Sequence, residues 1–546
     1  MAGMADAMAR LQSGDVAGAA DILERVVSRE PQNARAWRAL GLASRRARHL
    51  DRALAAYMKA LELEPGTPAA LYAVGAIHAL NHETDAAFVW LAKAKATHKI
   101  DMTQLETDED VATLETDARW ASLLPGPDDF AHPIVEPVKV IREWDGEAAN
   151  DQFGWIARRL GDVDGDGVPD FVTSAPTKAI GGKDAGRIYV YSTHTGRLIW
   201  SADGQPGDQL GTGIESAGDT DGDGIPDVIA GAPGGGYARV YSGKDGRVLL
   251  TFKSEHATDD FGRHVSGVGD VDHDGHADVI VGAPDNGAGG AKAGRAYVYS
   301  GKDGHALLTL TGAAAGDAFG SAVAGWSDAR QTLLIVGAPS AGSRKSGRTY
   351  VYRGLTQQPA FTIESDETGH ALGGMFVSVL GDVDGDGVPD VYASDWSNRA
   401  KGPSTGRVYV HSGRDGHRLL TLTGETEGEG FGTSPSVAGD IDGDGRADLI
   451  VGAWQYGGAA LSGGRAYLYS GRDGHLVKTF TCRTPGDTFG FDAVGMGDVD
   501  GDGTIDLLIT SAWSGVHHFH SGRIFIVSSG VQGSGAATGV NHPRLQ

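Results

Sequence analysis

From about residue 150 to residue 530 the chain repeats one pattern of apolar and polar positions. Each copy starts with small and apolar residues, as in FGRHVSGVGD (261–270), and passes through an aspartate-rich stretch into an apolar run, DVIVGAP (278–284). It ends with two β-rich segments around a Lys-Asp-Gly turn, GRAYVYSGKDGHALLTLTG (294–312). Short apolar runs predict strands, and the turn predicts a hairpin. Each copy therefore predicts four strands.

The spacing of the aspartate-rich phrase predicts seven copies. Six phrases recur about every 56 residues, and they begin at Asp162, Asp219, Asp270, Asp382, Asp440 and Asp498. The gap from Asp270 to Asp382 is twice as long, and it contains a degenerate copy without the acids, FGSAVAGWSDARQTLLIVGAPS (319–340). One glycine stands eight residues before each first aspartate position: Gly154, Gly211, Gly262, Gly320, Gly374, Gly432 and Gly490. Seven four-stranded units at this period predict a seven-bladed β-propeller over residues 136–530.

The two ends of the repeat array predict ring closure. The last copy stops at GRIFIVSSG (522–530) and lacks its fourth strand, whereas an isolated strand pattern, VKVIREWDG (138–146), precedes the first copy. We expect this strand to pair with the last unit, because pairing removes two open sheet edges. Residues 531–546 are predicted to be a flexible tail.

The first 100 residues have a different composition, rich in Ala, Leu, Arg and Glu. Pro31 and Pro65 are 34 residues apart, and Trp37, Gly41 and Tyr57 stand between them at a spacing that resembles a tetratricopeptide repeat. We expect about three such helical repeats over 1–100, and an acidic capping helix and linker over 101–135. The predicted fold class is thus multidomain, an N-terminal α-helical tetratricopeptide-like solenoid followed by an all-β propeller.

The units of Phe-Gly, Asp-x-Asp-x-Asp-Gly-x-x-Asp and Gly-Ala-Pro resemble the FG-GAP repeats of the integrin α-subunit propeller. The resemblance covers about 70% of the chain, residues 136 to 530. Three features depart from it: six of seven units carry the acidic loop, no adhesion domain is inserted, and nothing resembles the integrin legs or membrane segment. The resemblance therefore concerns the blade and implies calcium loops on one face and a ligand on the opposite face.

The aspartate loops have the donor pattern of a calcium site. Calcium takes six to eight oxygen ligands, and Asp at positions 1, 3, 5 and 9, with the carbonyl of position 7, supplies such a set around a glycine-rich turn. An EF-hand is rejected because position 12 is not Glu (Thr173 in the first loop), and magnesium suits the pattern less well. We expect about six structural calcium ions. The predicted ligands are Asp162, Asp164, Asp166, Val168 and Asp170; Asp219, Asp221, Asp223, Ile225 and Asp227; Asp270, Asp272, Asp274, His276 and Asp278; Asp382, Asp384, Asp386, Val388 and Asp390; Asp440, Asp442, Asp444, Arg446 and Asp448; and Asp498, Asp500, Asp502, Thr504 and Asp506.

Charge and composition limit the classes of function that the chain can have. The net charge is -24, which speaks against nucleic-acid binding. The six loops hold 24 of the 71 acidic residues, and the remaining 47 equal the 47 Lys and Arg, so the acidity points to bound cations. No apolar run is long enough to span a membrane. The single cysteine, Cys482, excludes an internal disulfide and a cysteine zinc cluster.

The residues near the Gly-Ala-Pro ends predict a ligand face. Aromatic and histidine side chains gather there in the last three units: Trp396, Trp454, Tyr456, Trp513, His517, His518 and His520. The alternative is that the tryptophans fill the central channel. No nucleophile elbow, zinc-protease motif or phosphate loop occurs, so we expect no catalytic residue.

We interpret the chain as a calcium-binding, non-enzymatic interaction, adhesion or scaffold protein that binds a protein or peptide through its helical repeats, its propeller face or both. The alternatives are a carbohydrate-binding, lectin-like propeller and the accessory domain of a hydrolase or lyase. The calcium loops favour an extracytoplasmic location, whereas the absence of a signal peptide favours the cytoplasm.

Overall fold

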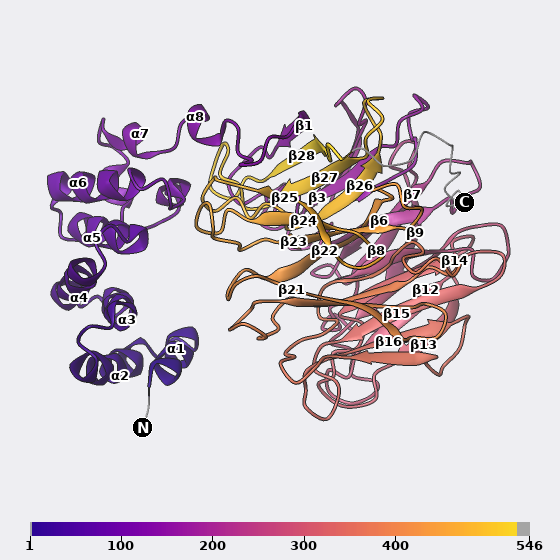
Figure 1. Cartoon of the computed structure of the whole chain (residues 1–546), viewed down its shortest axis with the longest axis horizontal. Helices are drawn as coiled ribbons and strands as arrows, with labels where there is room; N and C mark the ends of the chain where they lie inside the picture. Colours follow the sequence, from indigo (N-terminus) through magenta and orange to yellow (C-terminus); the bar gives the residue numbers. More distant parts are fainter. Residues whose placement is uncertain (1–2, 532–546) are drawn as a thin grey trace. The chain divides into compact units, whose positions relative to one another are not determined.

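The computed structural model describes residues 3–531, and its chain divides into two compact units at Ala131 and His132. All but the first residue of the predicted tail at 531–546 lies outside the described residues. The predicted fold class is confirmed: a helical unit is followed by an all-β propeller (Figure 1).

The helical unit is a stack of antiparallel helices in which each helix packs against the next. Its helices are α1 (Met4–Gln12), α2 (Val16–Arg29), α3 (Ala34–Arg46), α4 (Leu50–Leu63), α5 (Pro68–Leu80) and α6 (Thr84–Lys95). Gly41 shows why the repeat needs its small residue: a Cβ there would lie 2.8 Å from the ring of Tyr57. The side chain of Asn33 caps α3 by accepting the N–H of Ala36 at 3.0 Å.

The acidic segment after α6 differs from the expected capping helix. It forms two 3-10 turns and two helices of four residues: η1 (Met102–Glu106), η2 (Ala112–Leu114), α7 (Trp120–Leu123) and α8 (Pro127–Phe130). Asp101 and Asp117 accept backbone N–H groups two residues ahead, which favours turns over a continuous helix. Met102, Leu105 and Leu114 are buried in the core formed by α5 and α6, so the segment caps the stack as a series of turns.

The described part of the second unit contains seven antiparallel sheets of four strands each. Six blades are built from consecutive strands. These are β2 (Ala157–Arg159), β3 (Phe171–Ala175), β4 (Arg187–Tyr191) and β5 (Leu198–Asp203); β6 (Gly213–Gly218), β7 (Asp227–Ala232), β8 (Tyr237–Tyr241) and β9 (Val248–Lys253); β10 (Val265–Gly269), β11 (Asp278–Ala283), β12 (Arg295–Tyr299) and β13 (Ala306–Thr311); β14 (Ala322–Ser327), β15 (Thr332–Ala338), β16 (Arg348–Arg353) and β17 (Phe361–Glu364); β18 (Val377–Val379), β19 (Val391–Asp395), β20 (Arg407–His411) and β21 (Arg418–Thr423); and β22 (Phe431–Gly439), β23 (Asp448–Ala453), β24 (Arg465–Tyr469) and β25 (Leu476–Thr481).

The seventh blade joins the two ends of the propeller. It consists of β26 (Ala493–Gly497), β27 (Asp506–Ser511), β28 (Arg523–Ser528) and β1 (Val140–Asp145), and β1 runs antiparallel to β28 with Trp144 opposite Ile524. The first strand of every blade contacts the first strands of both neighbouring blades, so the innermost strands form a complete ring. The second strands are buried along their whole length and make up the core of the blades.

Two blades depart locally from the repeat. In the fourth blade the acid-free turn lies between β14 and β15, and Asp328 closes it by accepting the N–H groups of Arg330 and Gln331 at 2.8 Å. In the fifth blade Gly373, rather than Gly374, has the positive φ (+74°) and donates its N–H to Ser394. One residue is therefore inserted before β18, which the even spacing of the sequence did not indicate.

Candidate functional site

Each aspartate loop connects the first and second strands of a blade and wraps around its first carboxylate. In the first loop the carboxylate of Asp162 accepts the N–H groups of Gly165, Asp166 and Gly167 at 2.7, 3.0 and 2.8 Å. Gly165 and Gly167 have φ of +83° and +89°, a region that favours glycine. The glycines of the phrase thus allow the tight turn.

The structure brings three of the predicted ligand positions together. In four loops the carboxylate oxygens of positions 1, 3 and 9 lie within 4.8 Å of one another. The four groups are Asp162, Asp164 and Asp170; Asp219, Asp221 and Asp227; Asp270, Asp272 and Asp278; and Asp382, Asp384 and Asp390. Position 5 is outside these groups: one oxygen of Asp166 accepts the N–H of Val168 at 2.9 Å. Three converging carboxylates can hold a divalent cation.

In five of the six loops the aspartate at position 9 anchors the loop to the end of the third strand of its blade. Asp170 is buried, and it accepts the N–H of Val163 at 2.8 Å and that of Thr193, beyond the third strand, at 3.1 Å. Asp227 and Asp278 make the same long-range bond with Gly243 and Gly301. Burial raises the pKa of the position 9 carboxyls to about 6, or about 7 for Asp390. The groups with a pKa near 6 are Asp170, Asp227, Asp278, Asp448 and Asp506.

Within the aspartate loops, two buried carboxylate oxygens lack a hydrogen-bond partner among the described residues, and they test whether the loops fit a cation. Asp440 Oδ1 and Asp506 Oδ1 have no hydrogen-bond donor among the described residues, although one belongs to position 1 and the other to position 9. An unpaired buried carboxylate oxygen is unfavourable. A hard cation bound in each of the two loops would satisfy these oxygens, so the donor set fits calcium.

The raised pKa values predict how the calcium-free protein responds to pH. The folded chain holds these protons more tightly than the unfolded chain, so its free energy of unfolding falls as the pH rises from about 4 through 6 to 7. Between about pH 5 and pH 7.5 we expect the free energy of unfolding of the chelator-treated protein to fall by at least about 1.4 kcal/mol, the equivalent of one pKa unit at one site. Urea unfolding at about pH 5 and pH 7.5 checks this. A gain in stability over this range with chelator, or the same loss with saturating calcium, would contradict it.

Basic side chains of neighbouring segments contact the loops, and the pattern of aspartates did not predict these contacts. Arg414, in the hairpin turn of the fifth blade, pairs with Asp386 at 2.9 Å, and Arg247 pairs with Asp221 at 2.6 Å. In the seventh blade Lys139 takes this role, 2.5 Å from Asp500. Arg414 belongs to a repeated Gly-Lys/Arg-Asp-Gly turn that the sequence shows, whereas Arg247 follows such a turn and Lys139 precedes β1. These cations lower the negative charge around the loops and compete with a bound ion.

The predicted tryptophans of the ligand face do not form one group. Trp454 and Trp513 stack with ring centroids 5.1 Å apart, and Phe491 meets Trp513 edge-on at 4.8 Å. Trp155, which precedes the innermost strand β2, contacts Trp513 at 5.4 Å. The cluster therefore links the sixth, seventh and first blades. Trp396 makes none of these described ring contacts and packs against the core of the fifth and sixth blades.

The other predicted residues of this face have partners of their own. Tyr456 lies under the guanidinium of Arg465, 3.8 Å from the ring centroid. His517 approaches Asp145 of β1 at 3.4 Å, whereas His520 stacks on a neighbouring ring and has its pKa lowered to about 4 by burial. These two histidines therefore serve different contacts.

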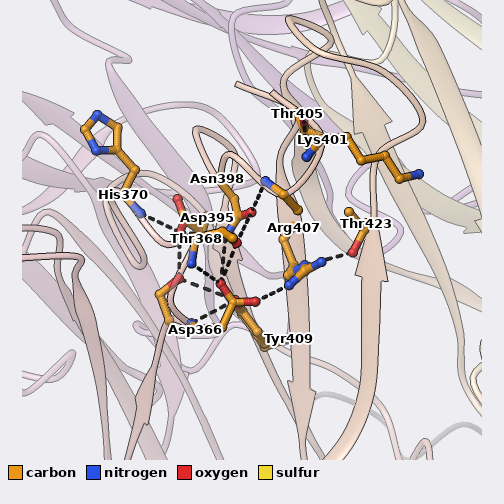
Figure 2. A network of polar contacts seen from close by, with 12 residues as sticks. Asp366, Thr368, His370, Asp395, Asn398, Lys401, Thr405, Arg407, Tyr409 and Thr423 are labelled. Atoms are coloured by element: carbon orange, nitrogen blue, oxygen red, sulfur yellow. Dashed lines mark hydrogen bonds and ion pairs between the residues drawn. The ribbon is translucent and has the colours of Figure 1, made fainter. Parts of the chain in front are cut away.

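Figure 2 shows that a polar network fixes the loops of the fifth blade. Asp395, at the end of β19, replaces the alanine of Gly-Ala-Pro and is buried. It accepts the hydroxyl of Ser365 at 2.7 Å and the N–H of His370 at 2.9 Å, and Arg407 pairs with Asp366 beside it. The network joins the end of the fourth blade to the fifth, so it holds two adjacent blades together.

Comparisons with known proteins define the class of this fold. The FG-GAP repeat family matches residues 159–191, 213–250 and 261–299, and the FG-GAP-like repeat family matches residues 382–451 and 440–509. The tetratricopeptide repeat family matches residues 34–67. The chain thus consists of a helical unit with a match to the tetratricopeptide repeat and a seven-bladed propeller that contains stretches matching FG-GAP repeats.

The more specific likeness is to integrin α subunits. The chain is 31% identical to integrin alpha pat-2 of Caenorhabditis briggsae over 260 residues, and 31% identical to integrin alpha-4 of Xenopus laevis over 205 residues. These matches cover 39% and 34% of this chain. It is also 34% identical to phosphatidylinositol-glycan-specific phospholipase D of Rattus norvegicus over 178 residues, 28% of this chain. The expected resemblance is confirmed.

The likeness concerns one part of the relatives. The matched segments span 19% of each of the two integrin subunits and 21% of the phospholipase. Among the described helices, none combines the length and the apolar composition needed to cross a bilayer.

Proposed function

We propose that this protein is a calcium-binding, non-enzymatic interaction protein, in which the propeller is stabilised by about six calcium ions and the helical unit holds a protein or peptide partner. The observation that carries the proposal is the convergence of three carboxylates in each of four repeated loops. The likeness to integrin α subunits supports an interaction role for the propeller, and the helical stack supports one for the first unit.

Calcium has a structural role in this proposal. The loops connect the first and second strands of six blades, and in five of them position 9 also bonds to the end of the third strand. An ion held there fixes three strands of one blade together. In this proposal the ion ties strands together and takes no part in a reaction.

Cross-linking of the full-length chain in extracts of its source cells, followed by mass spectrometry, tests the interaction role. We expect partner peptides to be cross-linked to residues of 3–131, and further cross-links to propeller loops that decrease when calcium is removed. A chain that yields no partner cross-link above a no-protein control would contradict the proposal. The variant with Asp384→Asn, Asp442→Asn and Asp500→Asn provides a matched control for the calcium-dependent part.

A further inference from the structure

The helical unit contains a cleft between α1, α3 and the acidic turn η1, and residues of α4 and α5 also line it. The cleft has a volume of about 460 Å³. Its apolar lining includes Met4, Met8, Leu42 and Ile100. A peptide side chain can be buried in such a cleft, so its charge pattern decides which peptide it accepts.

Arginines follow the face of α3 that lines the cleft. Arg35, Arg38, Leu42 and Arg45 succeed one another at intervals of three, four and three residues, which places them on one side of a helix. Arg35 is exposed and has no ion-pair partner among the described residues, whereas Arg38 forms an ion pair with Glu64. The open end of the cleft is therefore basic and apolar.

A contact within the chain indicates which chemical group the arginines on this face of α3 bind. At the other end, the guanidinium of Arg45 donates to both oxygens of Asp108, at 2.9 and 3.2 Å, and to Asp110 at 2.6 Å. Tyr72 donates its hydroxyl to Asp108 at 2.9 Å, and Arg48 adds an ion pair to Asp110. The side chains of Arg45 and Asp110 are only 14% and 12% exposed, so these contacts are well shielded from water.

This shielding separates the contacts from ordinary surface ion pairs. Arg45 holds two carboxylates at once, Asp108 through Nη2 and Asp110 through Nε, and such charge-assisted bonds are stronger than neutral ones. The acidic turn thus occupies one end of the groove with carboxylates two residues apart. The same face of α3 continues past Leu42 and Arg38, which pairs with Glu64, to Arg35, which has no ion-pair partner among the described residues.

We propose that the cleft between α1, α3 and η1 binds an acidic peptide of a partner protein, with carboxylates on Arg35 and Arg38 and an apolar side chain among Met4, Met8 and Leu42. The inference rests on the proposed interaction role of the helical unit and adds the chemistry of its partner. Residues 104–117 cover the far end of the groove and present Asp108 and Asp110 to Arg45 in the way that the partner presents its acids to Arg35.

Fluorescence anisotropy with the full-length chain tests this binding. The probe is a labelled peptide with the sequence of residues 104–117, QLETDEDVATLETD, and the matched probe has every Asp and Glu replaced by Asn and Gln. We expect the acidic probe to bind with a roughly micromolar Kd, at least about tenfold tighter than the amide probe, and more weakly in high salt.

Charge reversal locates the site. Arg35→Glu is expected to weaken binding of the acidic probe at least about tenfold, because it places a repelling charge at an exposed position without a native partner. Arg25→Glu on α2, which makes the same charge change outside the cleft, is the control, and circular dichroism verifies that both variants fold. Equal binding of the two probes, equal effects of the two variants, or no binding would overturn the inference. The cross-linking experiment judges the broader proposal separately, since partners can be captured even if the acidic probe does not bind.

Discussion

Deletion of residues 136–146 is expected to abolish the cooperative unfolding of the propeller and to produce an aggregating chain. This segment contains β1, the fourth strand of the seventh blade, and its loss exposes the whole edge of β28. An open edge with unpaired N–H and C=O groups is a template for pairing between chains. Scanning calorimetry and size-exclusion chromatography with light scattering check this. An unchanged monomer with a single unfolding transition would contradict the closure of the ring by β1.

A point variant separates ring closure from the simple loss of a strand. Trp144 of β1 is only 9% exposed, meets Phe171 of the first blade edge-on at 4.8 Å, and donates its indole N–H to Gly196 at 3.0 Å. It therefore joins the seventh blade to the first. Trp144→Ala is expected to lower the free energy of unfolding by about 3–5 kcal/mol.

The control for this variant lies on another outer strand. Leu476 of β25 is 46% exposed, so Leu476→Ala should change the free energy of unfolding by no more than about 0.5 kcal/mol. If the two variants change the free energy of unfolding equally in urea titrations, Trp144 does not hold the seventh and first blades together.

The propeller was predictable because its information is local and repeated. A buried second strand such as Asp278–Ala283 follows every loop, and the double gap between Asp270 and Asp382 marks the blade without acids. The pairing of β1 with β28 was also predictable, because the last repeat lacked its fourth strand and an isolated strand preceded the first repeat. Repetition turns weak strand signals into a strong prediction.

Contacts between distant segments were not predictable in the same way. The acidic composition of 101–135 indicated a capping helix and linker, but the capping bonds of Asp101 and Asp117 favour turns. Arg45 and Asp108 are 63 residues apart, and no periodicity relates them. The cleft that they border is therefore visible only in the structure.

The candidate metal loops lie between these two cases. The spacing of the aspartates predicted which carboxylates share a loop, since a tight turn brings positions 1, 3 and 9 together whatever surrounds it. It did not predict that Arg414 contacts Asp386, or that Trp454 stacks on Trp513, because both contacts depend on how segments from different places in the chain are packed.

Titration of calcium into chelator-treated protein is expected to reveal about six sites and a large gain in stability. The six loops concentrate 24 acidic residues, and binding neutralises their mutual repulsion in the folded chain only. Each site contributes about 2.7 kcal/mol when calcium is at 100 times its Kd. Because basic residues such as Arg414 and Lys139 already compete for the loops, we expect Kd values of about 10⁻⁴–10⁻³ M, the range of extracellular modules. Calorimetric titration and the melting temperature measure both effects, and sub-micromolar sites would instead suit a calcium-filled protein of the cytosol.

Two matched variants assign the ions to the loops. Asp384 Oδ1 accepts the N–H of Asp386 at 3.0 Å, a bond that an amide oxygen also makes, so Asp384→Asn removes a charged ligand while keeping the turn. It should lower the number of calcium sites by one. Asp328→Asn makes the same change in the acid-free turn of the fourth blade, where the aspartate bonds only to its own turn, and should leave the count unchanged. If Asp384→Asn binds as many ions as the wild type, the fifth-blade loop is not a calcium site, and if the wild type binds none, the structural role of calcium in the propeller is wrong.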